Sequence, residues 1–292
     1  MKPFRSENTI QHSVEVGGVG FFTNSDITVR FHPAPPLHGI SFSRIDLPGS
    51  KPIPALLEYA VFRERRTALQ REEAVVELTE HVLAALAGLQ IDNCLIEIDA
   101  PELPGGDGSA MLFVNALLQA GKVNQQVPRK MYLVEQKTKV SSNDSNATVV
   151  ATPNRQNNLQ ISYTLDYGQN SPVPSHAVTL NITPETFINE IAFARTFVLE
   201  KEVAYLKAAG YGKQTTARDL LVFKEDGSVI DNSLHRPDEC ARHKILDCIG
   251  DFALMGCDIH GTFQAIQSGH QLNREMVNVL QKSDHQKKYQ AA

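Results

Sequence analysis

The sequence has no apolar run long enough to cross a membrane, no closely spaced pair of cysteines and no excess of positive charge. A membrane-spanning helix needs about 20 consecutive apolar residues, so the sequence predicts no such helix. Four cysteines are spread along the chain without a CxxC pair or a dense disulfide pattern, and we expect them to be reduced, small residues of the core. These cysteines are Cys94, Cys240, Cys248 and Cys257.

The charge balance and the N-terminus exclude two further classes. The chain has 28 Lys and Arg against 33 Asp and Glu, a net charge of −5, so nothing suggests a nucleic-acid partner. The first residues, "MKPFRSENTIQHSVEV", lack the apolar core of a secretory signal. We therefore expect a cytoplasmic location and, with no sequence signal for assembly, a monomer.

The order of predicted elements repeats along the chain. Residues 10–45 alternate like strands, followed by a helix in "ELTEHVLAALAGL", a strand in "NCLIEIDA" and a helix in "MLFVNALLQAG". From about residue 129 a second set of strands begins, ending in "SHAVTLNIT", and helices follow again. A length of 292 residues also favours two domains. The sequence predicts an α+β protein with domains at 1–125 and 126–292, joined by a linker near 122–129.

Several elements are predicted in the second half. "PETFINEIAFA" has helix-start signals in Thr183 and Pro184, and "EKEVAYLKAAGYG" predicts a further helix. "RDLLVF" predicts a strand, and "DECARHKILDCIGDFALMG" predicts the main helix. A late strand, "GTFQAIQSGH", precedes a terminal helix in "NREMVNVLQKSD", and the polar tail "HQKKYQAA" is expected to fray.

The main helix, 238–256, carries His243, Asp247 and Asp251 at intervals of four residues. A step of four leaves side chains on nearly the same helix face, one turn apart. Burying an imidazole and two carboxylates is costly unless they are paired or bind a metal. The opposite face is predicted to be core: Ile245, Ile249, Phe252 and Ala253.

Glu80 and His81 open the apolar helix "TEHVLAALAGL". On their own they fit a solvated first turn equally well, and His-x-x-x-Asp pairs are common on helix surfaces. Together, His81, His243 and Asp247 would give Zn²⁺ three ligands and leave a fourth position open, as in catalytic sites. Glu80 would then be placed as the general base.

Three further residues are weaker candidates. His270 in "QSGHQLN" is a site residue or a surface-loop histidine; a hydrogen bond that it donates to Asp251 would favour its protonated form. Thr196 in "ARTF" offers a hydroxyl at the end of a helix, where threonine is also unremarkable. "PGGDGSA" is a tight turn, in which Asp107 could also brace a neighbouring group.

Five separated blocks, "TEHVLAALAGLQIDN", "PELPGGDGSA", "ARTF", "DECARHKILDCIGD" and "SGHQLN", together resemble the zinc-dependent UDP-3-O-acyl-N-acetylglucosamine deacetylases of lipid A biosynthesis. The resemblance runs from about residue 15 to 281. It implies two β-α-α-β halves with their helix layers packed between two sheets. It also implies a UDP-linked acylated amino sugar as substrate, with at most peripheral contact with membranes.

The resemblance assigns a role to each candidate. It implies one Zn²⁺ per chain bound by His81, His243 and Asp247, with Glu80 as the base. Thr196 and His270 would stabilise the oxyanion, His270 would protonate the leaving amine, and Asp251 would orient His270. On the substrate side, Lys244 would meet the nucleotide phosphates, Phe197 the sugar and Tyr167 the uracil base.

The segment 197–224 resembles the insert that forms an acyl-chain passage, where Val203, Leu206 and Tyr211 suit either a passage or core packing. Three pairs of residues depart from the usual pattern of the family: Gly105-Gly106, Val198-Leu199 and His235-Arg236. The first two leave open a zinc amidase acting on a different N-acetylated sugar. A separate alternative is a non-catalytic sugar-nucleotide binder of the same fold.

Overall fold

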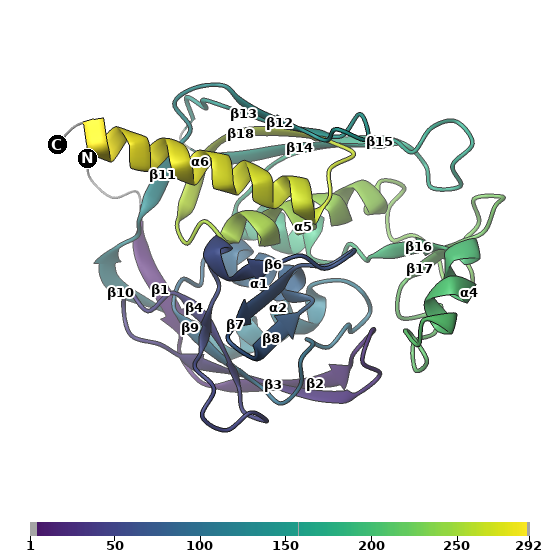
Figure 1. The fold of residues 1–292 in the computed structure, drawn as a ribbon, viewed down its shortest axis with the longest axis horizontal. Coiled ribbons are helices and arrows are strands. Elements are labelled where there is room, and N and C mark those ends of the chain that lie inside the picture. Colours follow the sequence, from purple (N-terminus) through teal and green to yellow (C-terminus); the bar gives the residue numbers. More distant parts are fainter. Residues whose placement is uncertain (1–4, 157, 291–292) are drawn as a thin grey trace.

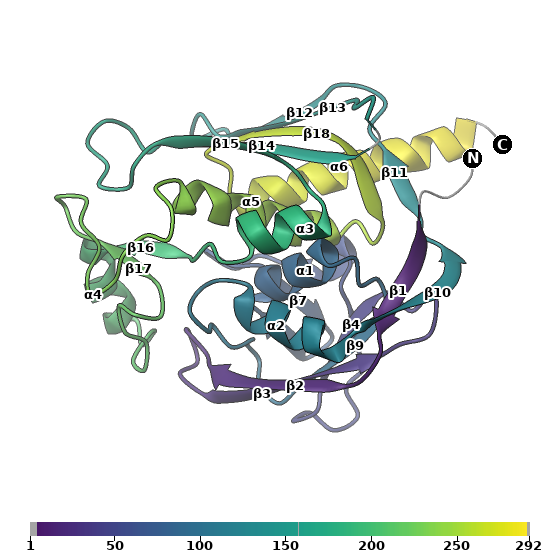
Figure 2. The same ribbon diagram turned by 180° about the vertical axis from the view of Figure 1, so that it is seen from behind.

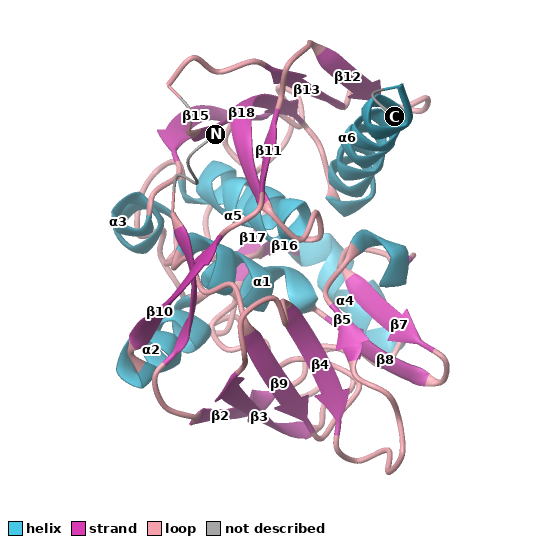
Figure 3. Ribbon diagram, turned by 90° about the vertical axis from the view of Figure 1, so that its left-hand side faces the viewer, coloured by secondary structure: helices cyan, strands magenta, loops and turns pink. Residues whose placement is uncertain are grey.

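Two β-sheets enclose a layer of helices in the computed structural model, which describes residues 5–156 and 158–290. Figures 1 and 2 show the sheets at opposite sides of the molecule with α1, α2 and α5 between them, and Figure 3 shows the same layers from the side. The architecture is the α+β arrangement that the sequence predicts.

The first sheet has five strands in the order β2-β3-β9-β4-β5. In β3 the side chains alternate between exposed and buried, because successive residues of a strand point to opposite faces. The buried face packs against helices α1 and α2. The elements are β2 (Val14–Val19), β3 (Asp26–Pro33), β4 (Ile40–Arg44), β5 (Ile53–Pro54), α1 (Thr79–Gly88), β9 (Cys94–Ile98) and α2 (Met111–Ala120).

The second sheet follows the same plan, with strand order β12-β13-β18-β14-β15 and a short strand, β11, paired to one end of β18. Helix α5 covers its inner face, and α6 runs beside β12 and β13 (Figure 1). The elements are β11 (Met131–Leu133), β12 (Thr138–Ser141), β13 (Thr148–Thr152), β14 (Leu159–Leu165), β15 (His176–Asn181), α5 (Glu239–Ala253), β18 (Asp258–Ile266) and α6 (His270–Gln290).

The two sheets are topological repeats. Reading along each strand order, the four pairings are antiparallel, antiparallel, parallel and antiparallel in both halves. In each half the last strand of the sheet lies at its centre and follows a buried helix, α1 or α5. The repeated sheet-then-helix order predicted from the sequence is therefore confirmed.

Each repeat has an extra segment directly before that buried helix. In the first half it contains a small three-stranded sheet, and in the second it contains a helix between two paired strands. The first segment contains η1 (Leu57–Tyr59), β6 (Ala60–Val61), β7 (Ala68–Arg71) and β8 (Ala74–Glu77). The second contains α3 (Pro184–Thr186), the π-helix η2 (Phe187–Ile191), β16 (Phe197–Leu199), α4 (Glu200–Ala208) and β17 (Leu221–Phe223). The last strand of the first segment ends directly before α1, whereas residues 224–238 separate the last strand of the second segment from α5.

Some sequence predictions differ from the structure. The predicted linker near 122–129 is a strand, β10 (Lys122–Pro128), which pairs with β1 (Ser6–Ile10). Its polar side chains resemble a linker because β10 lies at an edge and faces solvent on most positions. The predicted domain boundary between residues 125 and 126 falls within β10, and the division into these two domains stays a prediction. Thr183 caps α3 as expected, but that helix soon continues as a π-helix.

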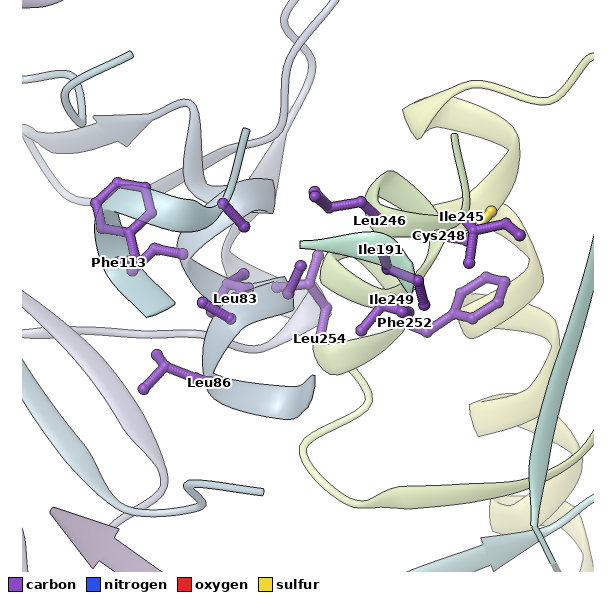
Figure 4. Close-up of a cluster of buried hydrophobic side chains, with 14 of the residues drawn as sticks. Leu83, Leu86, Phe113, Ile191, Ile245, Leu246, Cys248, Ile249, Phe252 and Leu254 are labelled. Carbon is purple, nitrogen blue, oxygen red and sulfur yellow. The ribbon is translucent and has the colours of Figure 1, made fainter. Parts of the chain in front are cut away.

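The centre of the core lies between α1 and α5, the helix pair in closest contact in the molecule. Figure 4 shows Leu83 of α1 and Leu246 and Ile249 of α5 among the buried side chains of this region, with Leu86 on the side of α1 away from α5 and Phe252 on the side of α5 away from α1. All five side chains are at most 3% exposed. Full burial of one such side chain stabilises the fold by about 1.5–3 kcal/mol. This packing fixes the two helices against each other and with them every polar group they carry.

None of the helices in residues 5–156 and 158–290 is both long and apolar enough to cross a membrane. Cys94, Cys240 and Cys248 are buried in the core as predicted, whereas Cys257 is partly accessible. Burial raises the pKa of the Cys94 and Cys240 thiols to about 12, so both are protonated at neutral pH.

Candidate metal centre and active site

Helix α1 begins abruptly after β8, and this places Glu80 and His81 in its first turn. Leu78 precedes the helix in the left-handed conformation, with φ of 63°. That conformation costs a residue with a side chain about 1–2 kcal/mol, and the backbone N–H of Thr79, which donates to the Thr67 carbonyl, holds it in place. Glu80 and His81 are 2% and 5% exposed, so the interpretation of a solvated first turn is wrong.

His243 and Asp247 project from α5 toward this turn of α1. Asp247 Oδ1 lies 3.4 Å from His243 Nε2 and 3.9 Å from His81 Nε2. One ligand atom from each of the three residues lies within 4.8 Å of the others, and all three residues are buried. The structure therefore brings together the three residues that the sequence predicts as metal ligands.

The polar atoms of this group fit a divalent cation. Asp247 Oδ1 is buried and has no hydrogen-bond partner among the described residues, whereas Oδ2 accepts a hydrogen bond from Lys244 Nζ at 2.8 Å. A buried acceptor without a partner costs about 1–3 kcal/mol, which a bound cation would offset. His243 Nδ1 lies 3.0 Å from the Ala194 carbonyl and so carries the proton, leaving Nε2 as a ligand. Two imidazole nitrogens and a carboxylate oxygen suit Zn²⁺.

Burial and charge set the protonation states that metal binding requires. Burial lowers the pKa of His81 to about 3 and also lowers the pKa of His243, so both imidazoles are neutral at pH 7. Burial alone would raise the pKa of Asp247, but the nearby Lys244 ammonium holds it below its usual range. Two neutral imidazoles and one carboxylate are thus available as ligands.

Glu80 lies beside the three ligands, next to His270. Its Oε2 accepts a hydrogen bond from the Thr67 backbone N–H at 2.9 Å, and its Oε1 lies 3.8 Å from His270 Nε2. Burial raises the pKa of Glu80 to about 7, although the charge of His270 acts in the opposite direction. A carboxylate with a pKa near neutrality is suited to accept a proton and release it again.

His270 is the first residue of α6, and its other ring nitrogen is paired with Asp251. Nδ1 lies 3.0 Å from Asp251 Oδ2, and Asp251 is fully buried. Burial would lower the pKa of His270, but the negative charges of Asp251, Asp247 and Glu80, together with the hydrogen bond to Asp251, raise it to about 9. The interpretation as a surface-loop histidine is wrong, and the predicted Asp251–His270 contact is present.

The sequence model of the family described as UDP-3-O-acyl N-acetylglycosamine deacetylase matches residues 7–282. The UDP-3-O-acyl-N-acetylglucosamine deacetylase of Myxococcus xanthus is 36% identical over 272 residues, covering 93% of this chain and 85% of that protein. The protein of the same name from Chlamydia abortus is 35% identical over 281 residues, covering 95% and 99%. The chain belongs to the UDP-3-O-acyl-N-acetylglucosamine deacetylase family. The resemblance read from the five sequence blocks is confirmed.

The glycine-rich turn of this deacetylase-family chain braces Thr196. The backbone N–H of Thr196 donates to the Gly108 carbonyl at 2.8 Å. Gly108 has φ of 80°, and a Cβ there would lie 2.9 Å from Thr196 Cγ2, so only glycine fits. Asp107, the residue singled out from the sequence, instead stabilises its own turn by accepting hydrogen bonds from Ser109.

The three predicted substrate-binding residues of the deacetylase-family site lie in one group. The ring of Phe197 is 6.4 Å from that of His243 and 6.3 Å from that of Tyr167, between centroids. Lys244 Nζ lies 5.6 Å from the centre of the Phe197 ring. Tyr167 is 51% exposed, so this group leads from the buried ligands to the surface.

The insert of this family member is fastened to the first half at its tip. Asn24 donates through Nδ2 to the Gly210 carbonyl at 2.9 Å and accepts through Oδ1 from the Lys213 backbone N–H at 2.6 Å. The Gly212 N–H donates to the Phe21 carbonyl at 2.7 Å. The departure at Gly105 has its explanation here, because a Cβ on Gly105 would overlap the ring of Phe21.

Several residues that contact Glu80 and Asp251 were not predicted from the sequence. Thr67 contacts both Glu80 and Asp251, and Asn273 Nδ2 donates to Asp251 Oδ2 at 2.8 Å. Gly250 lies against the backbone of Glu80. Asn273 follows His270 by three residues, so helical spacing could have indicated it, whereas nothing in the sequence marks Thr67.

Proposed function

We propose that this protein removes the N-acetyl group from a UDP-linked, 3-O-acylated N-acetylglucosamine, as a Zn²⁺-dependent hydrolase of lipid A biosynthesis. Water is consumed, the amide C–N bond breaks, and the products are acetate and the UDP-3-O-acyl-glucosamine amine. The observation that carries the proposal is the Glu80–His270 pair, 3.8 Å apart, directly beside three metal-ligand side chains. The cytoplasmic location and the monomeric state predicted from the sequence stay predictions.

His81, His243 and Asp247 would hold the ion. Because they supply three ligands, a fourth position stays open. A zinc ion in such a site acts as a Lewis acid toward a carbonyl group and toward water. The unpartnered Asp247 Oδ1 supports this assignment, and its neighbour Lys244 keeps the carboxylate ionised.

The chain's own residues divide the proton transfers between them. Glu80 accepts a proton from the attacking water, and the Thr67 N–H holds its carboxylate in place. His270, protonated and supported by Asp251, stabilises the negative charge on the former carbonyl oxygen and donates a proton to the departing amine. Thr196, held by Gly108, offers a second hydrogen bond to that oxygen. Stabilising this oxyanion contributes about 3–4 kcal/mol per donor in comparable enzymes.

The group formed by Lys244, Phe197 and Tyr167 would bind the rest of the substrate. Lys244 lies beside the ligands, where a cation suits the nucleotide phosphates, although its ammonium already contacts Asp247. Phe197 offers a ring face for the sugar, and the half-exposed Tyr167 offers one for the uracil base. The insert, 197–224, would contact the acyl chain through Val203, Leu206 and Tyr211.

The test is mass spectrometry of reactions containing the acylated UDP-sugar and, in parallel, the same sugar without its acyl chain. We expect a loss of one acetyl group from the acylated compound, which stops with a chelator and resumes when Zn²⁺ is added. Equal or faster turnover of the unacylated sugar would favour the amidase for another N-acetylated sugar. Tight binding of the sugar nucleotide without turnover and without metal would favour a non-catalytic binder.

A further inference from the structure

Thr67 lies at the junction between the small sheet of the first half and the catalytic helices. It directly precedes β7 and is fully buried. Along the chain it is separated by 13 residues from Glu80 and by 184 from Asp251, yet it contacts both. No sequence motif includes it, and the family's metal and proton-transfer roles are all assigned to other residues.

Each polar group of Thr67 has a separate partner in the site. The hydroxyl donates to Asp251 Oδ1 at 2.6 Å, and the backbone N–H donates to Glu80 Oε2 at 2.9 Å. The carbonyl accepts from the backbone N–H of Thr79, at 3.1 Å, in the first turn of α1. Thr67 therefore holds both Glu80, the proposed base, and Asp251, the carboxylate paired with the proposed acid His270.

The hydroxyl contact fixes the direction in which Asp251 faces His270. Oδ1 is taken by Thr67, while Oδ2 accepts from Asn273 Nδ2 at 2.8 Å and lies 3.0 Å from His270 Nδ1. With hydrogen bonds to both oxygens, the carboxylate plane is set. Without the hydroxyl, Oδ1 of a fully buried carboxylate loses this partner, and rotation of the carboxylate to recover one would carry Oδ2 away from His270.

We infer that Thr67 is a positioning residue for the acid His270, acting through the contact between its hydroxyl and Asp251 Oδ1, while its backbone N–H independently positions Glu80. The inference rests on the proposed function for its kinetic consequence alone. The arrangement of Asp251 and His270 that it describes can be measured without any substrate.

A comparison of Thr67→Val with Thr67→Ser separates the effect of the hydroxyl group from the effects of side-chain shape and of the backbone contacts of Thr67. Valine has the shape of threonine and keeps the backbone N–H to Glu80, and serine keeps the hydroxyl. We expect Thr67→Val to lower kcat by about 10- to 100-fold, the usual loss for an outer-shell partner, with KM and metal content changed less than about 2-fold. Thr67→Ser should stay within about 3-fold of the wild-type kcat.

A double-mutant cycle tests whether the hydroxyl works through His270. In a His270→Ala background, Thr67→Val should lower kcat by less than about 3-fold, because the group that it positions is gone. Additive losses would overturn the inference. Thr9→Val is the matched control: the Thr9 hydroxyl is also buried and donates at 2.7 Å, but to the carbonyl of Asn93, away from the site. It should leave kcat unchanged.

Proton NMR of the imidazole N–H signals gives a readout that needs no turnover. We expect a low-field signal from His270 Nδ1–H that is absent from His270→Ala, shifted or lost in Thr67→Val and kept in Thr67→Ser. An unchanged signal in Thr67→Val would overturn the inference, whatever the activity of that variant. If the wild type did not hydrolyse the acylated UDP-sugar, the proposed function would fail and the NMR comparison would still decide the role of Thr67.

Discussion

Gly250 of α5 lies directly against the backbone of Glu80 in α1, so closely that a Cβ atom on residue 250 would overlap the Glu80 carbonyl oxygen. Gly250 immediately precedes Asp251 and follows Asp247 by three residues. This close contact between a helix of each half therefore lies where Glu80 and two carboxylates of α5, Asp247 and Asp251, come together. The distance between these helices sets the geometry of the site.

Gly250→Ala should lower kcat by at least about 10-fold and destabilise the protein by about 1–3 kcal/mol. The added methyl group can be accommodated only by moving α1 away from α5, which overpacks the core and displaces Glu80. Steady-state kinetics and urea unfolding measure the two effects. Gly17→Ala is the control, because a Cβ there meets only the Ile27 carbonyl, at an ordinary 3.7 Å. A fully active Gly250→Ala would show that this contact does not set the position of Glu80.

Glu80→Gln should lower kcat by at least about 100-fold while one metal ion per chain is retained. The amide oxygen can still accept from the Thr67 N–H, but the side chain can no longer take a proton, and a general base contributes about 10²- to 10⁴-fold. Glu7→Gln is a matched control, since Glu7 is also buried and also accepts a backbone N–H, from Leu37. Near-wild-type turnover by Glu80→Gln would refute its assignment as the base.

His81→Ala should lower the affinity for Zn²⁺ by more than about 100-fold, because one of three ligands is lost. Elemental analysis after gel filtration measures this directly. Binding to the folded state alone also stabilises it, by about 2.7 kcal/mol at a free metal concentration of 100 Kd. The wild type should therefore melt at a higher temperature with Zn²⁺ than with chelator, and His81→Ala should not. His12→Ala, which changes an exposed histidine, should bind metal normally; equal metal content in His81→Ala would contradict the site.

The pH profile of kcat/KM should be bell-shaped. Glu80 must be ionised, so the rate rises with pH through its pKa, which burial raises to about 7. His270 must be protonated, so the rate falls as pH rises through its pKa, which the charges of Asp251, Asp247 and Glu80 together raise to about 9 against the effect of burial. A bound cation favours the deprotonated form of both groups and moves both limbs to lower pH. Loss of the alkaline limb in His270→Ala, measured over pH 5–10, would identify the acid; its persistence would refute the assignment.

Two of the three candidate metal ligands could be predicted together because their spacing is local. His243 and Asp247 lie four residues apart, with Asp251 four residues further on, and helix geometry alone places all three on one face. His81 could be added because two imidazoles and a carboxylate form a zinc-type ligand set, a choice that the resemblance to a family supported, although nothing in a single helix indicates which partner it will meet. The repeated order of strands and helices was likewise visible in alternating apolar positions.

The positions of Thr67 and Gly250 could not be predicted, because their roles exist only once distant segments pack. The Thr67 hydroxyl finds Asp251 across 184 residues of sequence. A glycine inside a helix suggests a residue that destabilises the helix, whereas Gly250 is needed because the backbone of α1 packs against α5 at this residue. The predicted linker failed for a related reason: an edge strand such as β10 carries polar side chains, and its pairing with β1 depends on backbone groups that side chains do not reveal.

The hydrogen bonds between Asn24 and residues 210 and 213 attach the insert to the first half at a point away from its two ends. A segment held in this way cannot swing aside as a hinged flap would without breaking those bonds. If this segment forms the acyl-chain passage, as proposed, a long hydrocarbon tail would have to enter lengthwise and leave by the same route. Arrival and departure of the tail, rather than bond cleavage, would then limit turnover as chains lengthen.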